Sequence, residues 1–352
     1  MRILVQGGPF FCDERILAAY SGPHEFRTLG YDSGVDVRYD PNTDTIADIV
    51  DRLAPDWPPD LLMCWAPEAY PPPQSIEDAP IPTAAFVSDW NLFYPVLEHN
   101  LARYDYVFCD GPGVPVLQNA LVSPQHVFPL YSQISTVHRR LSVEKDIDVA
   151  FAGNLNPAAH PIRNRLLGRL ARLSDRYRVV IASDLPREDY AALLNRARIV
   201  FNHSIRGELN LRIFETIACG ALPFLEAGNL EVRQWFQDGV DVVLYNDHNL
   251  EEKLVWYLEH PEELGAIAAK AHARAPEFAG ENRLDTLVEW IASHSSAGRR
   301  FRERAPFERA FHTWLQYGRS RWDALYPLET ELVNALTREY PTEPLAWSAL
   351  AQ

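Results

Sequence analysis

The sequence has few cysteines, no long apolar run and no lysine in its first 130 residues. Its 4 cysteines are scattered along 352 residues without a C-x-x-C pair. We therefore expect free thiols in a reducing, cytoplasmic compartment rather than a disulfide framework. No run of about eighteen apolar residues exists, so no membrane span is expected. The opening MRILVQGGPFF is too short in its apolar part for a signal peptide and predicts a first strand.

Several catalytic and metal-binding motifs are also missing. The chain has no H-E-x-x-H motif and no Cys/His cluster with zinc spacing, although it contains 11 histidines. It has neither a P-loop nor a G-x-S-x-G nucleophile elbow. We therefore expect no protein metal site and no bound cofactor.

Charge is distributed unevenly along the chain. Residues 1–130 contain 18 acidic residues against 6 arginines, which accounts for −12 of the total net charge of −15. An acidic surface of this kind repels nucleic acid and anionic lipid, so neither is an expected partner. The simplest interpretation is a solvated acidic face, and a neutral or basic acceptor is the alternative.

Short apolar runs alternate with helical patterns from the first residue, which predicts an α/β fold with parallel sheets. Strands are expected at Ile3 to Gln6, Val35 to Tyr39, Leu61 to Trp65, Thr83 to Val87, Tyr106 to Cys109 and Val127 to Leu130, and then at Asp148 to Ala152, Val179 to Ala182, Ile199 to Asn202, Leu222 to Leu225 and Val242 to Tyr245. Helices are expected at Ile46 to Leu53, Leu92 to Ala102, Pro161 to Leu173, Arg187 to Arg196, Leu211 to Ala218 and Leu250 to His260.

This pattern divides the chain into three parts. Residues 1–135 and 146–292 each predict a Rossmann-like doubly wound domain, joined by a linker between them that lacks periodicity. Two such domains are expected to face a central ligand cleft. Residues 293–352 predict a helical extension, in which Trp314 and Tyr317 are compatible with one degenerate tetratricopeptide unit but more simply with an amphipathic bracket.

The most informative segment is NHSIRGELNLRIFETIACGALPFLE, from Asn202 to Glu226. It follows a buried strand and predicts a helix whose first turns carry Arg206, Glu208, Arg212 and Glu215. A helix that begins at the carboxyl end of a parallel strand directs free N–H groups and a positive dipole end toward a ligand. Cations beside carboxylates suit a ligand that carries both phosphates and sugar hydroxyls, such as a nucleotide-sugar.

Residues 146–292 resemble the nucleotide-binding domain of GT-B glycosyltransferases, in particular the family-4-like enzymes and the branch named after the spore-maturation protein CgeB. The motifs that carry the resemblance are Phe151-Ala152-Gly153-Asn154, Asp184 with Tyr190, Asn210-Leu211-Arg212-Ile213-Phe214-Glu215 and Ala218-Cys219-Gly220-Ala221. For the front half the similarity extends only to the general architecture.

The resemblance implies roles for individual residues. Arg212, and after it Arg206, would neutralise the departing diphosphate without a metal ion, because guanidinium groups match phosphate oxygens. Glu215 matches the carboxylate that accepts hydrogen bonds from the ribose. Gly153 and Asn154 would approach the phosphates, although a plain strand-to-helix turn also explains this pair. Ser183 and Asp184 would hold the base, and Asn210 and Leu211 complete the expected donor-binding residues.

The resemblance also has a gap. The related enzymes place a second Glu eight positions before the ribose-binding one, but this chain has Gly207 there and Glu208 next to it. Glu208, or backbone N–H groups around Leu209 and Asn210, would therefore take over the contact with the transferred sugar.

On the acceptor side the candidate is Asp89 in Ser88-Asp89-Trp90, where related enzymes often carry His-Asp. Asp89 can orient or deprotonate an acceptor hydroxyl, while Trp90 can stack on a sugar ring. Asp89 can equally act as the N-cap of the following helix.

These inferences predict a metal-independent glycosyltransferase that uses a UDP- or GDP-sugar, with retention of anomeric configuration favoured. A nucleotide-sugar epimerase and a non-catalytic binding protein are the alternatives. The acceptor, whether glycan, small molecule, lipid or protein, is not specified by the fold.

Overall fold

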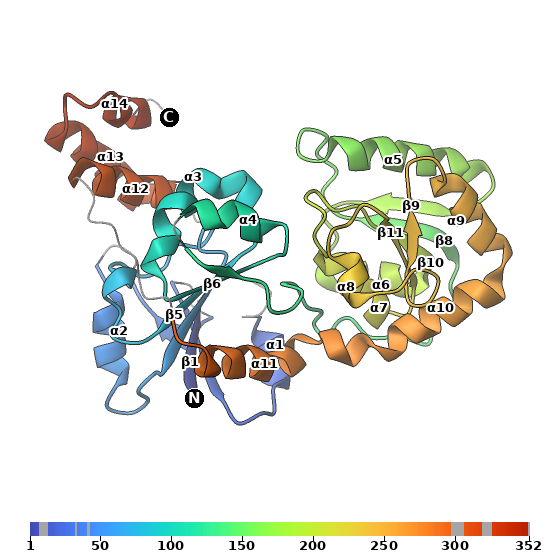
Figure 1. Ribbon diagram of the computed structural model, residues 1–352, viewed down its shortest axis with the longest axis horizontal. Helices are drawn as coiled ribbons and strands as arrows, with labels where there is room; N and C mark the ends of the chain where they lie inside the picture. Colours follow the sequence, from blue (N-terminus) through green and yellow to red (C-terminus); the bar gives the residue numbers. More distant parts are fainter. Residues whose placement is uncertain are drawn as a thin grey trace. The chain divides into compact units, whose positions relative to one another are not determined.

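The computed structural model describes residues 1–6, 13–31, 34–40, 43–120, 122–296, 306–318 and 326–350. The chain forms two compact units, each built around one parallel sheet (Figure 1). The first unit comprises residues 1–14, 22–128 and 288–352, and the second comprises residues 15–21 and 129–287. The predicted α/β class with two doubly wound domains is therefore confirmed. The two units are interleaved along the chain. The predicted divisions at residues 135, 146 and 292 stay predictions.

The sheet of the first unit has seven strands in the order β3-β2-β1-β4-β5-β6-β7, with every pairing parallel. The strands are β1 (Arg2–Gln6), β2 (Glu25–Gly30), β3 (Val37–Arg38), β4 (Leu61–Trp65), β5 (Thr83–Val87), β6 (Tyr106–Cys109) and β7 (Pro124–Gln125).

The strand predictions for this sheet miss one strand and include one that does not form. The strand β2 was not expected, because its sequence EFRTLG mixes charged and half-buried residues and resembles a loop. The expected strand at Val127 to Leu130 does not form, and β7 ends at Gln125 instead.

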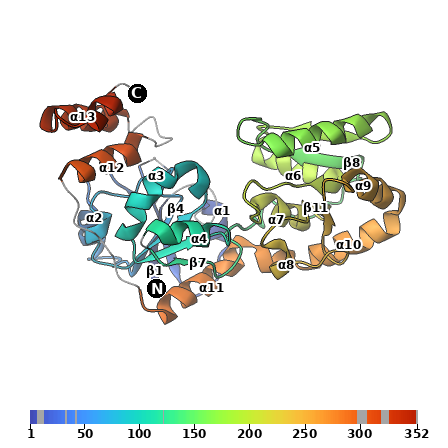
Figure 2. The same ribbon diagram turned by 45° about the horizontal axis from the view of Figure 1, so that its top comes forward.

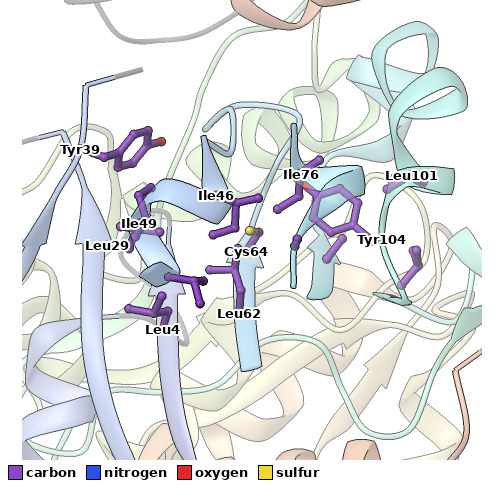
Figure 3. Close-up of a cluster of buried hydrophobic side chains, with 14 of the residues drawn as sticks. Leu4, Leu29, Tyr39, Ile46, Ile49, Leu62, Cys64, Ile76, Leu101 and Tyr104 are labelled. Carbon is purple, nitrogen blue, oxygen red and sulfur yellow. The ribbon is translucent and has the colours of Figure 1, made fainter. Parts of the chain in front are cut away.

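Helices α2 (Ile46–Leu53), α3 (Trp90–Asn100) and α4 (Gly113–Leu117) pack their apolar residues on one face of this sheet. Figure 3 shows this core, where Ile46 and Ile49 of α2 lie over Leu4 and Leu62 of the strands. The opposite face carries a stack of Trp65, Phe86 and Phe108. Trp290 of α11 (Gly280–Ser293) packs edge-on against Phe108, with ring centroids 5.3 Å apart.

The predicted helical extension is present as α12 (Pro306–Gly318), α13 (Tyr326–Glu339) and α14 (Pro344–Leu350). These helices share a small apolar core around Trp314 and Leu336. Leu332 of α13 also packs against the core of the first unit, and α12 lies beside α3 (Figure 2). Parts of the predicted helices at residues 301–305 and 319–325 lie outside the described residues.

The sheet of the second unit has five parallel strands in the order β12-β11-β10-β8-β9. They are β8 (Ile147–Ala152), β9 (Val179–Ala182), β10 (Ala197–Phe201), β11 (Leu222–Glu226) and β12 (Val243–Tyr245). All five lie where the sequence predicts a strand. The strand order reverses between β8 and β10, which makes their carboxyl ends the switch point at which doubly wound sheets bind ligands.

Helices cover both faces of this second sheet. Apolar residues of α5 (Pro161–Ala171), α9 (Leu250–Glu259) and α10 (Pro261–Ala273) form the core on one face. On the other face, α6 (Arg187–Arg196) packs beside α7 (Leu211–Ala218). The short helices α1 (Glu14–Ala19) and α8 (Val232–Trp235) complete the set that we describe.

Helix α7 begins at the switch point and has a well-defined end. Gly220 follows it with φ of +70°, the left-handed conformation that glycine adopts without a steric penalty. The N–H of Gly220 donates to the carbonyl of Ile217 and that of Ala221 donates to Thr216, which is a Schellman motif. Gly220 therefore terminates α7, as the sequence predicts.

The predicted linker between residues 131 and 146 is fastened to the second unit by α11. Arg283 of α11 is buried, and its Nη1 donates to the carbonyl oxygens of Pro129 and Tyr131 at 2.9 and 2.6 Å. Gln133 exchanges two backbone hydrogen bonds with Phe278 and Gly280, both at 3.0 Å. Burial lowers the pKa of Arg283 to about 9, because removal from water disfavours the charged form. Hydrogen bonds to the two carbonyl oxygens offset part of this cost.

Substitution of Arg283 by leucine should leave both carbonyl oxygens buried without their donor. We expect Arg283→Leu to lower the free energy of unfolding by about 2–4 kcal/mol in urea titrations. Arg176→Leu is the control, because Arg176 is largely exposed and its loss should cost less than about 0.5 kcal/mol. Equal stability of the two variants would contradict a fastening role for Arg283.

Candidate functional site

Arg212, in the first turn of α7, bridges the two strands at the switch point. Its Nε and Nη2 both donate to the carbonyl oxygen of Ala152 at the end of β8, at 2.9 and 2.7 Å. Its Nη1 donates to Oδ1 of Asn202, just after β10, at 2.7 Å. The guanidinium is thus held in one orientation at the carboxyl edge of the sheet.

Gly153 makes room for this guanidinium. Its φ is +154°, and a Cβ atom placed there would lie 2.3 Å from Nη2 of Arg212. The Cζ of Arg212 also lies 4.3 Å from the centre of the Phe151 ring. A glycine at the end of β8 is therefore required by the close approach of Arg212, and the turn itself is a secondary reason.

A second arginine, Arg163 of α5, lies at the same place. Its Cζ is 5.3 Å from the Phe151 ring, and its Nη2 donates to the carbonyl oxygen of Asn154 at 2.5 Å. Only 6% of this residue is exposed, and its Nε has no hydrogen-bond partner within the described part of the chain.

These two guanidinium groups repel each other electrostatically. Burial, and then the charge of Arg212, lower the pKa of Arg163 to about 10. The carboxylates of Glu208 and Glu226 act in the opposite direction but do not cancel the shift. An anion bound between the arginines would relieve this repulsion.

The N-terminus of α7 adds further positive potential. Asn210 occupies the N-cap position without a side-chain cap hydrogen bond, and its Nδ2 donates to Asn202 Oδ1 at 3.1 Å. Leu211 is the first residue of the helix and is half-buried. The first N–H groups of the helix therefore lie on the same edge of the sheet as the two arginines.

Glu215 lies one turn further along α7 and is nine-tenths buried. Its Oε2 accepts a hydrogen bond of 2.6 Å from the hydroxyl of Tyr190, and its Oε1 lies 3.6 Å from Nε2 of His138. Burial, and then the charge of Glu215, raise the pKa of Tyr190 well above its ordinary value, so the phenol remains a donor. Glu215 is thus a fixed carboxylate with lone pairs still available.

Arg206 and Glu208 lie in the loop before α7, not in its first turns as predicted, because the helix begins only at Leu211. Both side chains are almost fully buried, with Nη2 of Arg206 at 3.8 Å from Oε1 of Glu208. Glu208 also accepts the backbone N–H of Arg206 at 2.8 Å. This contact holds the loop in place and ties Glu208 to Arg206.

The remaining predicted donor residues lie at neighbouring strand ends. Asn154 follows β8, and its Oδ1 accepts from the N–H of Asn156 at 2.8 Å, so this side chain organises its own turn. Ser183 and Asp184 follow β9, and the exposed Asp184 has φ of +54°. The carboxyl edge of the second sheet therefore carries every predicted donor-side residue.

Asp89 belongs to the first unit, at the carboxyl end of β5. It occupies the N-cap position of α3, yet its side chain makes no cap hydrogen bond. A buried carboxylate, Glu68, accepts the N–H groups of Ser88 and Asp89, both at 2.8 Å. Burial raises the pKa of Glu68. The indole N–H of Trp90 donates to Asp110 at 2.9 Å, which fixes the ring.

Beyond the arginine pair, the buried Glu226 and the half-buried His203 organise the loop ends. Glu226, at the end of β11, accepts hydrogen bonds from the N–H and hydroxyl of Ser204. His203 places its Nδ1 3.2 Å from the hydroxyl of Tyr245 and 3.8 Å from Oε2 of Glu226. Burial and the nearby Arg163 and Arg165 lower the pKa of His203 to about 4.

Over the ranges that the structure describes, no three His, Cys, Asp or Glu side chains gather closely enough to hold a metal ion. No helix in that part of the chain combines the length and apolarity needed to cross a membrane.

The sequence did not identify Arg163 or Glu68 as functional candidates. Arg163 is one of several arginines on α5, and only its contact with Phe151 distinguishes it. Glu68 lies in a proline-rich loop after β4, and its hydrogen bonds with Ser88 and Asp89 are non-local. No sequence spacing marks either contact.

Part of the sequence matches a family model, and the fold is similar to that of solved structures. Residues 137–289 match the family model described as "Glycosyl transferase-like". The solved structure of HepE from Anabaena with UDP-glucose matches with a TM-score of 0.55 and 14% identity, covering 84% of this chain and 100% of that one. An alpha-glucosyltransferase in complex with UDP and a 13-mer DNA matches with a TM-score of 0.57 and 11% identity, covering 84% and 99%. No curated protein matches the sequence.

The resemblance to GT-B glycosyltransferases is thereby confirmed, and the chain has the GT-B type of fold. The CgeB-like subtype stays a prediction.

The lowered pKa of His203 should make stability depend on pH. The unfolded chain binds a proton near pH 6.5 and the folded one only near pH 4, so the free energy of unfolding falls as pH decreases through that window. We expect Tm of His203→Gln to fall less steeply than that of the wild type between pH 7 and 4. The exposed His248→Gln is the control and should follow the wild type. Parallel curves for all three proteins would contradict a buried neutral His203.

Proposed function

We propose that the protein is a glycosyltransferase that moves a sugar from a nucleotide diphosphate sugar to an acceptor hydroxyl. The observation that supports this most directly is the pair of arginines at the switch point beside the N-terminus of α7, Arg163 buried and Arg212 half-buried. Transfer breaks the bond between the anomeric carbon and the diphosphate and forms a bond to the acceptor oxygen. Negative charge grows on the departing diphosphate, and donors held in advance stabilise that charge.

Arg212 and Arg163 supply the positive charge that a divalent cation would otherwise provide, so we propose that transfer is independent of a metal. Each guanidinium keeps N–H groups beyond those that bind Ala152, Asn154 and Asn202, because an arginine has five of them. The α7 N–H groups add to this field. Arg206, in the loop before α7, adds a further positive charge that the neighbouring Glu208 carboxylate partly offsets.

Glu215 suits the ribose of the nucleotide. Tyr190 and His138 fix its carboxylate, and two oxygens match the spacing of a vicinal diol. We propose a uridine nucleotide, because the two similar structures described above contain UDP-glucose and UDP. Ser183 and Asp184 lie at the strand end where the base would bind.

The acceptor would bind to the first unit, where Asp89 is placed by Glu68. We favour retention of configuration, with the acceptor proton passing to the departing diphosphate. The alternatives are an epimerase, which would convert the donor to an epimer, and a non-catalytic binding protein, which would bind it without turnover.

Calorimetry with UDP and turnover of UDP-glucose, both in EDTA, test this function. We expect the wild type to bind UDP and to release it slowly from UDP-glucose. Arg212→Ala and Glu215→Ala should each weaken UDP binding at least about tenfold, because each removes a charged partner of the ligand.

Arg198→Ala is the control for this experiment. Arg198 lies at the amino end of β10, where it pairs with Asp148 at 3.0 Å, far along the strand from the switch point. Its loss should leave UDP affinity unchanged. Undiminished UDP binding in Arg212→Ala, or a strict need for magnesium, would refute the proposal.

Gly153→Ala provides an independent test of the arginine geometry. The new methyl group would meet Nη2 of Arg212 and force the guanidinium away from Ala152. We expect UDP affinity to fall about tenfold, as in Arg212→Ala. Gly168→Ala is the matched control, since a Cβ atom there meets nothing within 4 Å. Equal UDP affinity in both glycine variants would count against the close approach of Arg212 to bound nucleotide.

A further inference from the structure

The first unit contains a cavity of about 310 Å³ at the amino-terminal edge of its sheet. Met1, Leu61, Pro82 and Tyr106 line it at or just before the amino ends of four strands, and residues 291–295 line it from the end of α11. The last turn of α11 lies beside the start of β1 (Figure 1). The proposed acceptor residues follow the carboxyl end of β5, so this cavity is separate from them. Its volume is at the lower end of the range of about 300–1,000 Å³ for small-molecule sites, which indicates a small ligand.

The end of α11 gives this edge a negative potential. No basic side chain lies in the last turn of the helix. The hydroxyl of Tyr106 donates to the carbonyl oxygen of His294 at 2.8 Å, but those of Ala292 and Ser293 accept no hydrogen bond from the described chain. Carbonyl groups left over at the end of a helix carry partial negative charge and attract cations.

Two carboxylates add to this potential. Asp60 and Asp105 each precede a lining residue, and each accepts a backbone N–H at a strand start, that of Arg2 at 2.7 Å and that of Thr83 at 2.8 Å. The charge of Asp105 acts on the cavity wall, because it adds to burial in raising the pKa of Tyr106. The cavity is therefore flanked by negative charge on the strand side as well as on the helix side.

Positive charge near the cavity is directed elsewhere. The amino group of Met1 lies 3.2 Å from Nδ1 of His24, and Arg2 pairs with Glu25 at 3.7 Å. No lysine or arginine side chain of the described chain lines the cavity. A cationic ligand would consequently be favoured over an anionic one of the same shape.

We propose that this cavity binds a small organic amine in its protonated form, with the ammonium group donating to the carbonyl oxygens of Ala292 and Ser293. The apolar part of the amine packs against the buried Leu61 and Ile291 and against Pro82. The ligand carries no nucleotide and lies away from the strand ends used for sugar transfer. The inference therefore goes beyond the proposed function and does not rest on it.

Saturation-transfer NMR on the full chain at pH 7 tests this site. The probes are butylammonium and phenethylammonium, with pentanoate and 3-phenylpropionate as carboxylates of matched shape. We expect at least one amine to bind saturably with Kd on the order of millimolar. Its matched carboxylate should bind at least about tenfold more weakly, because the wall repels negative charge.

Two variants of opposite charge locate the ammonium group. Ala292 is exposed, so Ala292→Lys and Ala292→Glu should both fold, which circular dichroism melting checks. Ala292→Lys places a tethered ammonium beside the α11 carbonyls and should bind the amine at least about fivefold more weakly than Ala292→Glu. Ala266→Lys in α10 is the control, since Ala266 is also exposed and does not line the cavity. It should bind the amine as the wild type does.

UDP binding separates this site from the proposed donor site. Ala292→Lys should keep the UDP affinity of the wild type, and UDP should not displace the amine. The proposal is overturned if neither amine binds the wild type or if the carboxylates bind as tightly as the amines. It is equally overturned if Ala292→Lys binds the amine as tightly as Ala266→Lys, or if UDP competes with the amine.

Discussion

The hydrogen bonds from Arg212 to Ala152 and Asn202 join the two strands between which the order of the second sheet reverses. Neighbouring features follow from this contact. Gly153 has no side chain because the guanidinium occupies that space, and Phe151 forms the surface on which both arginines lie. Arg212 therefore links the two strand ends, and in the proposed function it is also part of the diphosphate site. This link fixes the guanidinium before any ligand arrives, which lowers the cost of ordering it on binding.

Two carboxylates close to the arginine pair reduce the electrostatic repulsion between the guanidinium groups. Glu208 and Glu226 offset part of the repulsion that Arg163 experiences. The same two residues hold the loop after β10, through Arg206 and Ser204 respectively. Loop structure and local charge are therefore coupled, so a substitution in this loop changes both. Because of this coupling, the role of Glu208 cannot be inferred from its sequence spacing alone. Its neighbour Gly207 stands where related enzymes carry a Glu.

Much of this fold was predictable because its strands are continuous apolar runs, as in Leu61–Trp65 and Leu222–Glu226. The strand β2 was missed because it is half-exposed and contains Glu25 and Arg27. Arg212 and Glu215 were identified as candidates from their motif; both lie on α7, which begins at the switch point, and their roles stay predictions. Arg163 was missed because its importance arises only when α5 packs over Phe151, a contact that no local pattern encodes.

The segment at residues 15–21 packs with residues 129–287, although it is embedded in the front half of the sequence. Its Arg15 pairs with Glu188, its Tyr20 donates to Asp285, and Ile16 lies directly against Gly280. Neither half can consequently be excised as one uninterrupted stretch of polypeptide. A chimera that joins residues 129–287 to a relative would also have to include residues 15–21. Without them, the surface around Gly280 that Ile16 covers would be exposed.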